Sequence, residues 1–446
     1  MKKHNKLEPE NKKSDSELRR KFFERKNSLL TDLCQDKDKA AVAHLFMAVI
    51  IGYLGYAAIE DAFYNKRSGS GIKFILTCFP KFGLAVAFWI VLFLGSLLLF
   101  LGFQLWGRLR IYLFPKSMIL KTLDTASLII FIMYCVGSLI FTSYVTFSGR
   151  ISYSSSIFLI LETFRMFAKS YAFVRDSAPK ILENKLTTKK LYFPTFSNYL
   201  HFMFVPTLIY NDVYPRLKTP VRWSFVGHWL IHSVFSVILV GRLMEYFIFE
   251  MDNYEKFHLI DLVKFSFKFH FIMTVIIILT FYVILHCVQN IFAELLGFPY
   301  KVFYTNWWAS KDYIDFFYKW NTLVRDWFYV YVYLDVYENL TNNNKFLAKY
   351  TVFILSAVFH EMIPTLTLGY CIPVTFVEYI VLVAVVPIIK IRNEIWANIF
   401  FWFSMSMGIA FCITFYILET LARIKCPIDD STFSNYFTPR VISCFA

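Results

Sequence analysis

Long apolar stretches recur along most of this chain and are separated by short polar segments. Most of them approach the ~20 residues that cross ~30 Å of hydrocarbon as an α-helix. A helix also satisfies its own backbone hydrogen bonds, as lipid requires. The pattern predicts an all-α polytopic membrane protein with about nine crossings. The stretches lie near residues 42–59, 83–105, 125–147, 224–249, 268–290, 349–368, 372–390 and 396–421, with weaker ones at 156–174, 199–210 and 327–337.

The polar N-terminal region precedes the first of these stretches. Residues 1–40 are rich in charged side chains and lack a sustained apolar face. We expect them to form a cytosolic N-terminal arm with a short helix over Ser16–Cys34, followed by a membrane domain over residues 41–446. The arm is either disordered or a contact surface for a homo-oligomer (dimer or tetramer), and its composition is compatible with both.

A second polar region lies between the third and fourth strong apolar stretches. Residues 160–222 combine apolar segments with ten Lys and Arg side chains and include Pro194, Pro206, Pro215 and Pro220. A stretch with so many charges and helix breakers is not expected to face lipid. It predicts a cytosolic loop whose helices rest on the membrane surface.

Composition narrows the class of protein further. Apolar residues make up 57% of the 446 residues and charged residues only 17%, against about 25% charged in soluble domains. The formal charge of +14 comes from basic residues in short runs beside apolar stretches, which is the pattern of cytoplasmic loops. No nucleic-acid-binding motif accompanies this charge. The lipid bilayer is therefore the expected environment, and a nucleic-acid partner is not expected.

One pair of ionisable residues interrupts a strong apolar stretch. His360 and Glu361 lie between apolar neighbours over Val352–Thr367. Ionisable side chains inside a membrane segment are costly and usually face a bundle interior or a water-filled cavity. A neutral imidazole can accept a proton near physiological pH, as a general base must. From this pattern alone, His360 is either a catalytic base or a structural histidine in a helix interface.

The spacing of polar residues around His360 is compatible with binding the two ends of one long substrate. Ser356 precedes it by four residues, on the same helix face. Lys345 precedes it by fifteen, which is roughly 22 Å along a helix, near the reach of a pantetheine arm. Lys345 alone is equally typical of a snorkelling lysine. Asn321 and Arg325 are spaced to share a helix face, and a buried Asn321 amide can position a reacting carbonyl or hydroxyl.

The segment Phe303–Ala309 (FYTNWWA) resembles the FYxDWWN motif of the sterol O-acyltransferase (ACAT) family within the membrane-bound O-acyltransferase (MBOAT) superfamily. Further matches in the same order extend the resemblance over most of residues 40–446. They are Pro206–Tyr210 with Asp212, Tyr214–Arg216, Val221–Trp223, Trp320–Asn321, Asp326–Trp327, Ser356–Glu361 and Cys426–Pro427. A run of this order and spacing is specific, whereas the pair Trp307–Trp308 alone would be weak.

The resemblance implies an endoplasmic reticulum enzyme of nine transmembrane helices that joins a long-chain acyl group from acyl-CoA to a sterol hydroxyl. By position, His360 is similar to the catalytic histidine and Asn321 to its partner asparagine. His44 corresponds to a histidine near bound sterol, and Cys426 and Cys444 match a lumenal disulfide. The positions similar to acyl-CoA-binding residues are Trp320, Tyr333, Lys345, Ser356 and, where the family usually has histidine, Arg325; the motif residues are Phe303, Tyr304, Asn306, Trp307 and Trp308.

Three departures from the family pattern stand near these residues. Asn306 replaces the motif aspartate, Ala309 replaces its final asparagine, and Arg325 replaces a histidine. Arg325 stays charged and cannot act as a base. These changes leave His360 and Asn321 in place, but they predict altered acyl-CoA affinity or acceptor choice.

The expected chemistry is direct transfer without an acyl-enzyme. Ser356 is a poor nucleophile because no GxSxG turn surrounds it. The cysteines form no CxxC pair and the histidines have no HExxH spacing, so no metal and no cofactor is expected beyond the co-substrate acyl-CoA. Three alternatives stay open: a diacylglycerol or fatty-alcohol acceptor, a non-catalytic sterol-binding protein, and a transporter.

Overall fold

The computed structural model describes residues 21–64, 72–113, 117–183, 191–252, 259–341, 343–384, 391–427 and 433–444. The elements within these ranges are helices. The β-type backbone pairing in the described chain is one isolated bridge between Lys26 and Tyr300. The prediction of an all-α chain is therefore confirmed. The longer helices are α3 (Lys37–Tyr64), α5 (Phe82–Leu113), α6 (Ser117–Phe147), α7 (Tyr153–Leu182), α9 (Trp223–Asp252), α10 (Leu259–Phe281), α15 (Lys345–Leu368) and α17 (Glu394–Lys425).

Shorter elements connect these helices. They are α2 (Leu29–Leu33), α4 (Ile72–Cys78), α8 (Phe196–Phe204), α11 (Gln289–Leu295), α12 (Tyr313–Trp320), α13 (Thr322–Phe328), α14 (Leu334–Asn339), α16 (Val374–Ala384) and α18 (Val441–Cys444). Two π-helical turns, η1 (Tyr282–Val288) and η3 (Tyr329–Tyr333), lie within continuous helical segments. Such turns displace one residue from the α-helical ladder and are frequent at functional sites.

Six helical segments of the described chain are long and apolar enough to cross a membrane. They are Phe82–Leu113, Met118–Phe147, Trp223–Asp252, Ile260–Leu295, Lys345–Leu368 and Glu394–Lys425, and a shorter apolar stretch, His44–Tyr56, lies within α3. The polytopic membrane class is therefore confirmed, while nine crossings stay a prediction. The strong apolar stretch predicted at 372–390 corresponds to α16, and its last six residues lie outside the described ranges.

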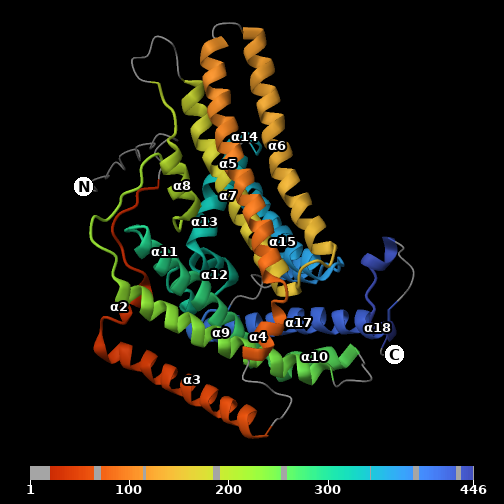
Figure 1. Cartoon of the computed structure of the whole chain (residues 1–446). Helices are drawn as coiled ribbons and strands as arrows, with labels where there is room; N and C mark the ends of the chain where they lie inside the picture. Colours follow the sequence, from red (N-terminus) through yellow and green to blue (C-terminus); the bar gives the residue numbers. More distant parts are fainter. Residues whose placement is uncertain are drawn as a thin grey trace, which may run out of the picture.

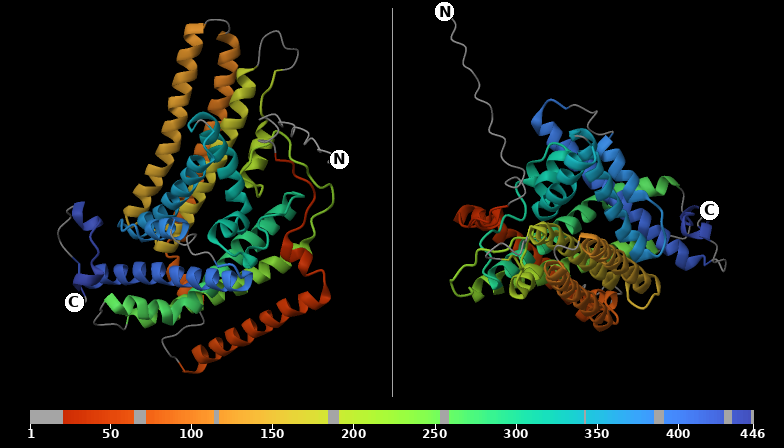
Figure 2. Two further views of the ribbon diagram at one scale, coloured as in Figure 1. Left: turned by 180° about the vertical axis from the view of Figure 1, so that it is seen from behind. Right: turned by 90° about the horizontal axis from the view of Figure 1, so that it is seen from above.

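The helices form two groups that run crosswise to each other. In Figures 1 and 2, α5, α6 and α7 lie side by side as one group, and α15 packs against α6 and α7. The second group contains α9, α10 and α17, with α3 on its outer side along α9. A large aromatic core joins α5, α7 and α8 to the segment around α12 and α13. The candidate site residues lie around this junction.

The prediction that residues 160–222 form a surface loop is wrong for its first third, because α7 is a 30-residue helix packed against α5, α6 and α15. Its charges have partners inside the protein. Lys169 is buried and donates from Nζ to the carbonyl oxygens of Phe202 (2.6 Å) and Val205 (2.8 Å). Arg165 forms an ion pair with Glu162 at 2.7 Å. Paired charges can lie in an interior that would exclude single ones, and the sequence does not reveal this pairing.

The N-terminal segment is extended and packed where it is described. From Lys21 to Ser28 the chain is not helical, so that part of the predicted helix Ser16–Cys34 is wrong, and residues 1–20 lie outside the described ranges. Phe23 is buried against Phe298 and Tyr300, with ring centroids 5.3 and 5.7 Å apart. This contact attaches the segment to the body of the protein.

A disulfide closes the C-terminal segment. Cys426 at the end of α17 and Cys444 at the end of α18 are bonded, with Cα atoms 5.9 Å apart across 18 residues. A crosslink over a loop of this size restricts the unfolded chain and can stabilise the segment by about 3 kcal/mol.

Mass spectrometry of peptides from the non-reduced protein should find Cys426 linked to Cys444. Cys412, which lies on the same helix α17 and is a free thiol in the structure, should be alkylated under the same conditions and serves as the control. Recovery of both Cys426 and Cys444 as free thiols from unreduced membranes would contradict the crosslink.

Candidate active site

One helix, α15, carries three of the predicted site residues. It begins where the Asn344 side chain accepts hydrogen bonds from the backbone amides of Phe346 and Leu347, and it ends at Gly369, whose φ of 80° suits a residue without a side chain. Lys345 is its first residue and is exposed. Ser356 and His360 lie in the same uninterrupted helix, so Lys345 and His360 are separated by about 22 Å along its axis.

The imidazole of His360 has a defined set of partners. Its Nδ1 atom lies 2.7 Å from the Ser356 carbonyl oxygen, and its Nε2 atom lies 3.1 Å from the Tyr379 hydroxyl. Because a carbonyl oxygen can only accept, the ring hydrogen of neutral His360 resides on Nδ1. Nε2 therefore carries the free lone pair and accepts from Tyr379. This is the tautomer in which Nε2 can act as a base.

The side chain of His360 is exposed in the structure, so of the two surroundings predicted for it, a bundle interior or a water-filled cavity, a tightly packed interior is not the one observed. The buried member of the pair is Glu361, at 8% exposure. Consecutive residues of a helix point in directions about 100° apart, so only one of the two can face the interior.

The Glu361 carboxylate joins three helices. One oxygen accepts from the Tyr416 hydroxyl of α17 at 2.8 Å, and the other accepts from the backbone amide of Phe376 in α16 at 2.9 Å. Thr365, one turn later on α15, donates to it at 3.4 Å. A buried carboxylate requires such partners. Glu361 therefore supports the helix arrangement.

An aromatic layer connects the His360 region to α12. The rings of His360 and Tyr379 lie with centroids 4.7 Å apart, and Tyr379 stacks on Phe317 of α12 at 5.3 Å. Phe317 also contacts Phe353 of α15 at 6.1 Å. Asn321 lies four residues after Phe317, at the end of α12. The layer thus places Asn321 about one helical turn from the ring that backs Tyr379.

Asn321 forms the junction between α12 and α13. The spacing predicted that Asn321 and Arg325 share a face inside one helix, but Asn321 lies outside the helix that contains Arg325. Its backbone is extended (φ −138°, ψ 92°), and its side-chain oxygen accepts from the Val324 amide at 3.2 Å, capping α13. The Nδ2 amide group is therefore the part that Asn321 can offer to a substrate. In the described part of the chain, no hydrogen bond joins Asn321 to His360.

The motif Phe303–Ala309 is hydrogen-bonded to the residues on both sides of this junction. The Thr322 amide donates to the Phe303 carbonyl at 3.0 Å, and the Thr305 amide donates to the Lys319 carbonyl at 2.9 Å. Trp307 is buried against Trp320 with ring centroids 4.9 Å apart. The motif therefore contributes scaffolding around Asn321. Phe303 and Tyr304 are also buried, whereas Asn306 and Trp308 are exposed.

A further histidine, His286 in η1, is fully buried and is not among the residues that the sequence pattern predicted. The hydroxyl of Tyr304, a motif residue, lies 2.7 Å from its Nδ1 atom, and its ring contacts Trp229 at 4.3 Å. Its position within the predicted apolar stretch 268–290 was a visible signal. Its buried environment and its link to the motif depend on the fold.

The remaining predicted residues lie at three separate places. Arg325 donates to the Asp326 carboxylate at 2.6 and 2.8 Å and to the Tyr318 carbonyl at 2.9 Å. Lys21 contacts the other oxygen of Asp326. Burial lowers the pKa of Lys21 from its ordinary value, and the charge of Asp326 opposes this shift. Asp326 thus holds the N-terminal segment and α13 together.

Tyr333 and His44 belong to different helical groups. Tyr333 lies in η3 between Tyr329 and Tyr337, with ring centroids 5.5 and 5.9 Å away. His44 lies on α3 and is exposed. The helix α3 packs against α9. The structure therefore separates the residue predicted to contact sterol from the helix that carries His360.

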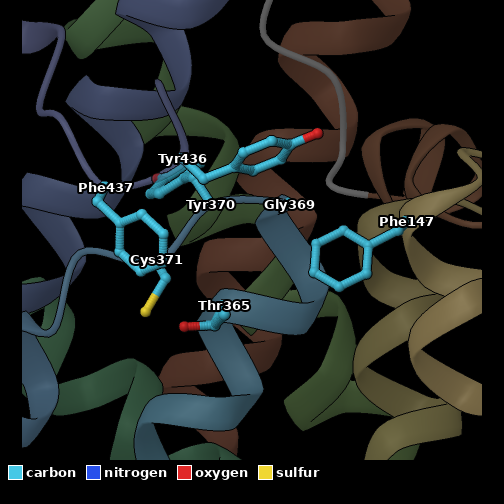
Figure 3. A pocket seen from close by; sticks show the side chains of 7 residues that line it. All are labelled: Phe147, Thr365, Gly369, Tyr370, Cys371, Tyr436 and Phe437. Carbon is cyan, nitrogen blue, oxygen red and sulfur yellow. The ribbon is translucent and has the colours of Figure 1, made fainter. Parts of the chain in front are cut away.

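A cavity of about 470 Å³ opens beyond His360, near the end of α15. Figure 3 shows its lining side chains around the space between the ends of α6 and α15 and the C-terminal segment. Thr365, which contacts Glu361, is the lining residue nearest to His360 along α15. The full lining is Phe147, Thr365, Gly369, Tyr370, Cys371, Tyr436 and Phe437. Among the described residues, no cluster of His, Cys, Asp or Glu is arranged to hold a metal ion.

Comparisons with known proteins place the chain in a family. Residues 75–418 match the model of the membrane-bound O-acyltransferase family. Sterol O-acyltransferase 1 of Mus musculus is 32% identical over 433 residues, covering 95% of this chain and 79% of its own. Sterol O-acyltransferase 2 of Homo sapiens is 28% identical over 438 residues, covering 96% and 81%. The chain therefore belongs to the membrane-bound O-acyltransferase family, is similar to the sterol O-acyltransferases within it, and is an acyltransferase.

Proposed function

We propose that this chain transfers a long-chain acyl group from acyl-CoA to the hydroxyl of a sterol in the endoplasmic reticulum membrane, with His360 as the general base. The observation that carries the proposal is the contact between His360 Nδ1 and the Ser356 carbonyl oxygen at 2.7 Å. The Ser356 carbonyl holds the ring hydrogen on Nδ1, so the Nε2 lone pair is available for a proton. The similarity to sterol O-acyltransferases favours a sterol as the acceptor.

The proposed acyl-CoA binds along α15. Lys345 at the exposed N-terminus of the helix contacts the nucleotide phosphates, about 22 Å from the base. Trp320, Tyr333, Ser356 and Arg325 complete the acyl-CoA-binding set that the resemblance implies, and His44 remains the candidate for a sterol contact. Holding both substrates in one orientation removes roughly 7–11 kcal/mol of barrier in well-aligned systems.

The transfer proceeds in one direct step. The acceptor oxygen attacks the thioester carbon as its proton moves toward Nε2 of His360. The bond to sulfur breaks, and the protonated imidazole returns the proton to the leaving thiolate, which gives CoA and the ester. The Asn321 oxygen caps α13, so its Nδ2 group is the donor proposed to stabilise the carbonyl oxygen.

The departures from the family pattern are compatible with activity. Asn306 is exposed and makes no side-chain hydrogen bond at the start of its turn, so its neutral amide does not disturb an internal contact. Arg325 pairs with Asp326 and so has a structural role in place of base chemistry. A sterol-binding protein without turnover is the second candidate, and the loss of the histidine at 325 is what favours it.

The lipid product identifies the acceptor. Membranes that contain the chain receive labelled oleoyl-CoA together with cholesterol, diacylglycerol and a long-chain alcohol in one competition. We expect steryl ester as the main product, separated by thin-layer chromatography. Triacylglycerol or wax ester in excess would move the acceptor to the alternative class. Sterol binding without any labelled ester would support the non-catalytic candidate.

A further inference from the structure

We propose that the hydroxyl of Tyr379 relays the proton of the acceptor alcohol to His360, which makes Tyr379 a catalytic residue. This inference rests on the proposed function and deepens it. Its starting point is the position of the hydroxyl, 3.1 Å from Nε2. In the described chain, this is the hydrogen bond that Nε2 receives. The lone pair needed for base catalysis is therefore already directed at Tyr379.

A direct path from the acceptor to Nε2 would require Tyr379 to leave. Nδ1 is engaged by the Ser356 carbonyl at 2.7 Å, so the ring cannot offer its other nitrogen without losing that bond. The Tyr379 oxygen, in contrast, donates one hydrogen and keeps two lone pairs for accepting. An acceptor hydroxyl can bind there while Tyr379 stays in place.

One contact holds the ring of Tyr379, and another holds the helix that carries it. Its ring stacks on Phe317 of α12 with planes inclined by 22°. The Phe376 amide, three residues earlier on α16, donates to Glu361 at 2.9 Å, and Glu361 is the neighbour of His360 on α15. The backbone of α16 is therefore joined to a side chain of α15 within one turn of both reacting side chains.

The relay conserves protons and electrons. As the acceptor oxygen forms its bond to the thioester carbon, its hydrogen moves to the Tyr379 oxygen, and the original Tyr379 hydrogen moves to Nε2. Tyr379 is neutral before and after the step. The imidazolium then returns a proton to the thiolate that leaves as the carbon–sulfur bond breaks. No oxidant, reductant or additional reactant takes part.

The test compares Tyr379→Phe with the unchanged chain in steady-state ester formation. Phenylalanine retains the ring that packs on Phe317 and His360 and removes only the hydroxyl. We expect kcat to fall about 10²-fold, the lower range for loss of a positioned proton-transfer group. KM for acyl-CoA should stay within about twofold, because the relay acts on the acceptor hydroxyl in the transition state. 3-Fluorotyrosine at position 379, which restores the hydroxyl, should recover most of kcat.

Tyr134→Phe is the matched control, because it removes a tyrosine hydroxyl that contacts a single hydroxyl partner, Ser170, at 3.3 Å between α6 and α7. It should leave kcat unchanged. A Tyr379→Phe enzyme with unchanged kcat, or one whose loss 3-fluorotyrosine does not reverse, would overturn the relay. In both cases an active unchanged chain leaves the proposed function standing. An unchanged chain that forms no ester from any acceptor would overturn the proposed function and the relay together.

Discussion

Replacing His360 by alanine is expected to lower ester formation by 10²–10⁴-fold, the range typical for removal of a general base. The change should leave the fold intact. His360 is exposed, and its hydrogen bonds are those to the Ser356 carbonyl and the Tyr379 hydroxyl. The Ser356 carbonyl still accepts its helical hydrogen bond in α15 when the ring is absent. Surface changes of this kind usually alter the free energy of unfolding by no more than about 0.5 kcal/mol.

His270→Ala is a suitable control for this measurement. His270 also lies in an apolar helix, and its Nδ1 atom also contacts a carbonyl of its own helix, that of Phe267 at 2.7 Å. It has no place in the proposed site. The two purified variants should unfold at similar temperatures, and only His360→Ala should lose activity with labelled oleoyl-CoA. More than a tenth of the original activity in His360→Ala would remove His360 from the mechanism.

The apolar pattern predicted most of the helices because membrane helices are defined by their composition over ~20 residues. Most of the strong apolar stretches lie within helical segments, as at α5, α9 and α17. The helix that carries His360 was equally predictable, because Lys345, Ser356 and His360 are close in sequence. Their common helix follows from local periodicity alone.

The features of the fold and the site that the local sequence pattern did not reveal depend on packing between segments that are distant in the sequence. The burial of Glu361 in place of His360 is set by α16 and α17, which lie at least 13 residues further along the chain. The contact between Tyr379 and His360 and the placement of α7 inside the bundle have the same origin. The helix breaks at Asn321 because the Asn321 side chain caps α13. Asparagine side chains often bond to nearby backbone amides, which favours helix caps over helix interiors.

Replacing Glu361 by alanine should have the second largest effect, and it should act on stability and activity together. The change removes the acceptor of the Tyr416 hydroxyl and of the Phe376 amide. Hydrogen bonds to charged groups contribute about 1.5–3 kcal/mol each. Tyr416 can still donate to the Ile372 carbonyl at 3.2 Å, so we expect a total loss of about 2–4 kcal/mol. Activity should fall more than tenfold, because α16 carries Tyr379.

Two variants separate the contribution of each bond to Glu361. Glu361→Gln keeps one oxygen for Tyr416 but turns an amide group toward the Phe376 N–H, so we expect it to lose roughly half as much stability as alanine. Tyr416→Phe removes the other partner. A double-mutant cycle between Glu361→Ala and Tyr416→Phe, followed by thermal unfolding in detergent, should then give a coupling of about 0.5–3 kcal/mol. Additive effects, or a Glu361→Ala enzyme with unchanged unfolding and activity, would show that α16 is held by other contacts and that Tyr379 does not depend on Glu361.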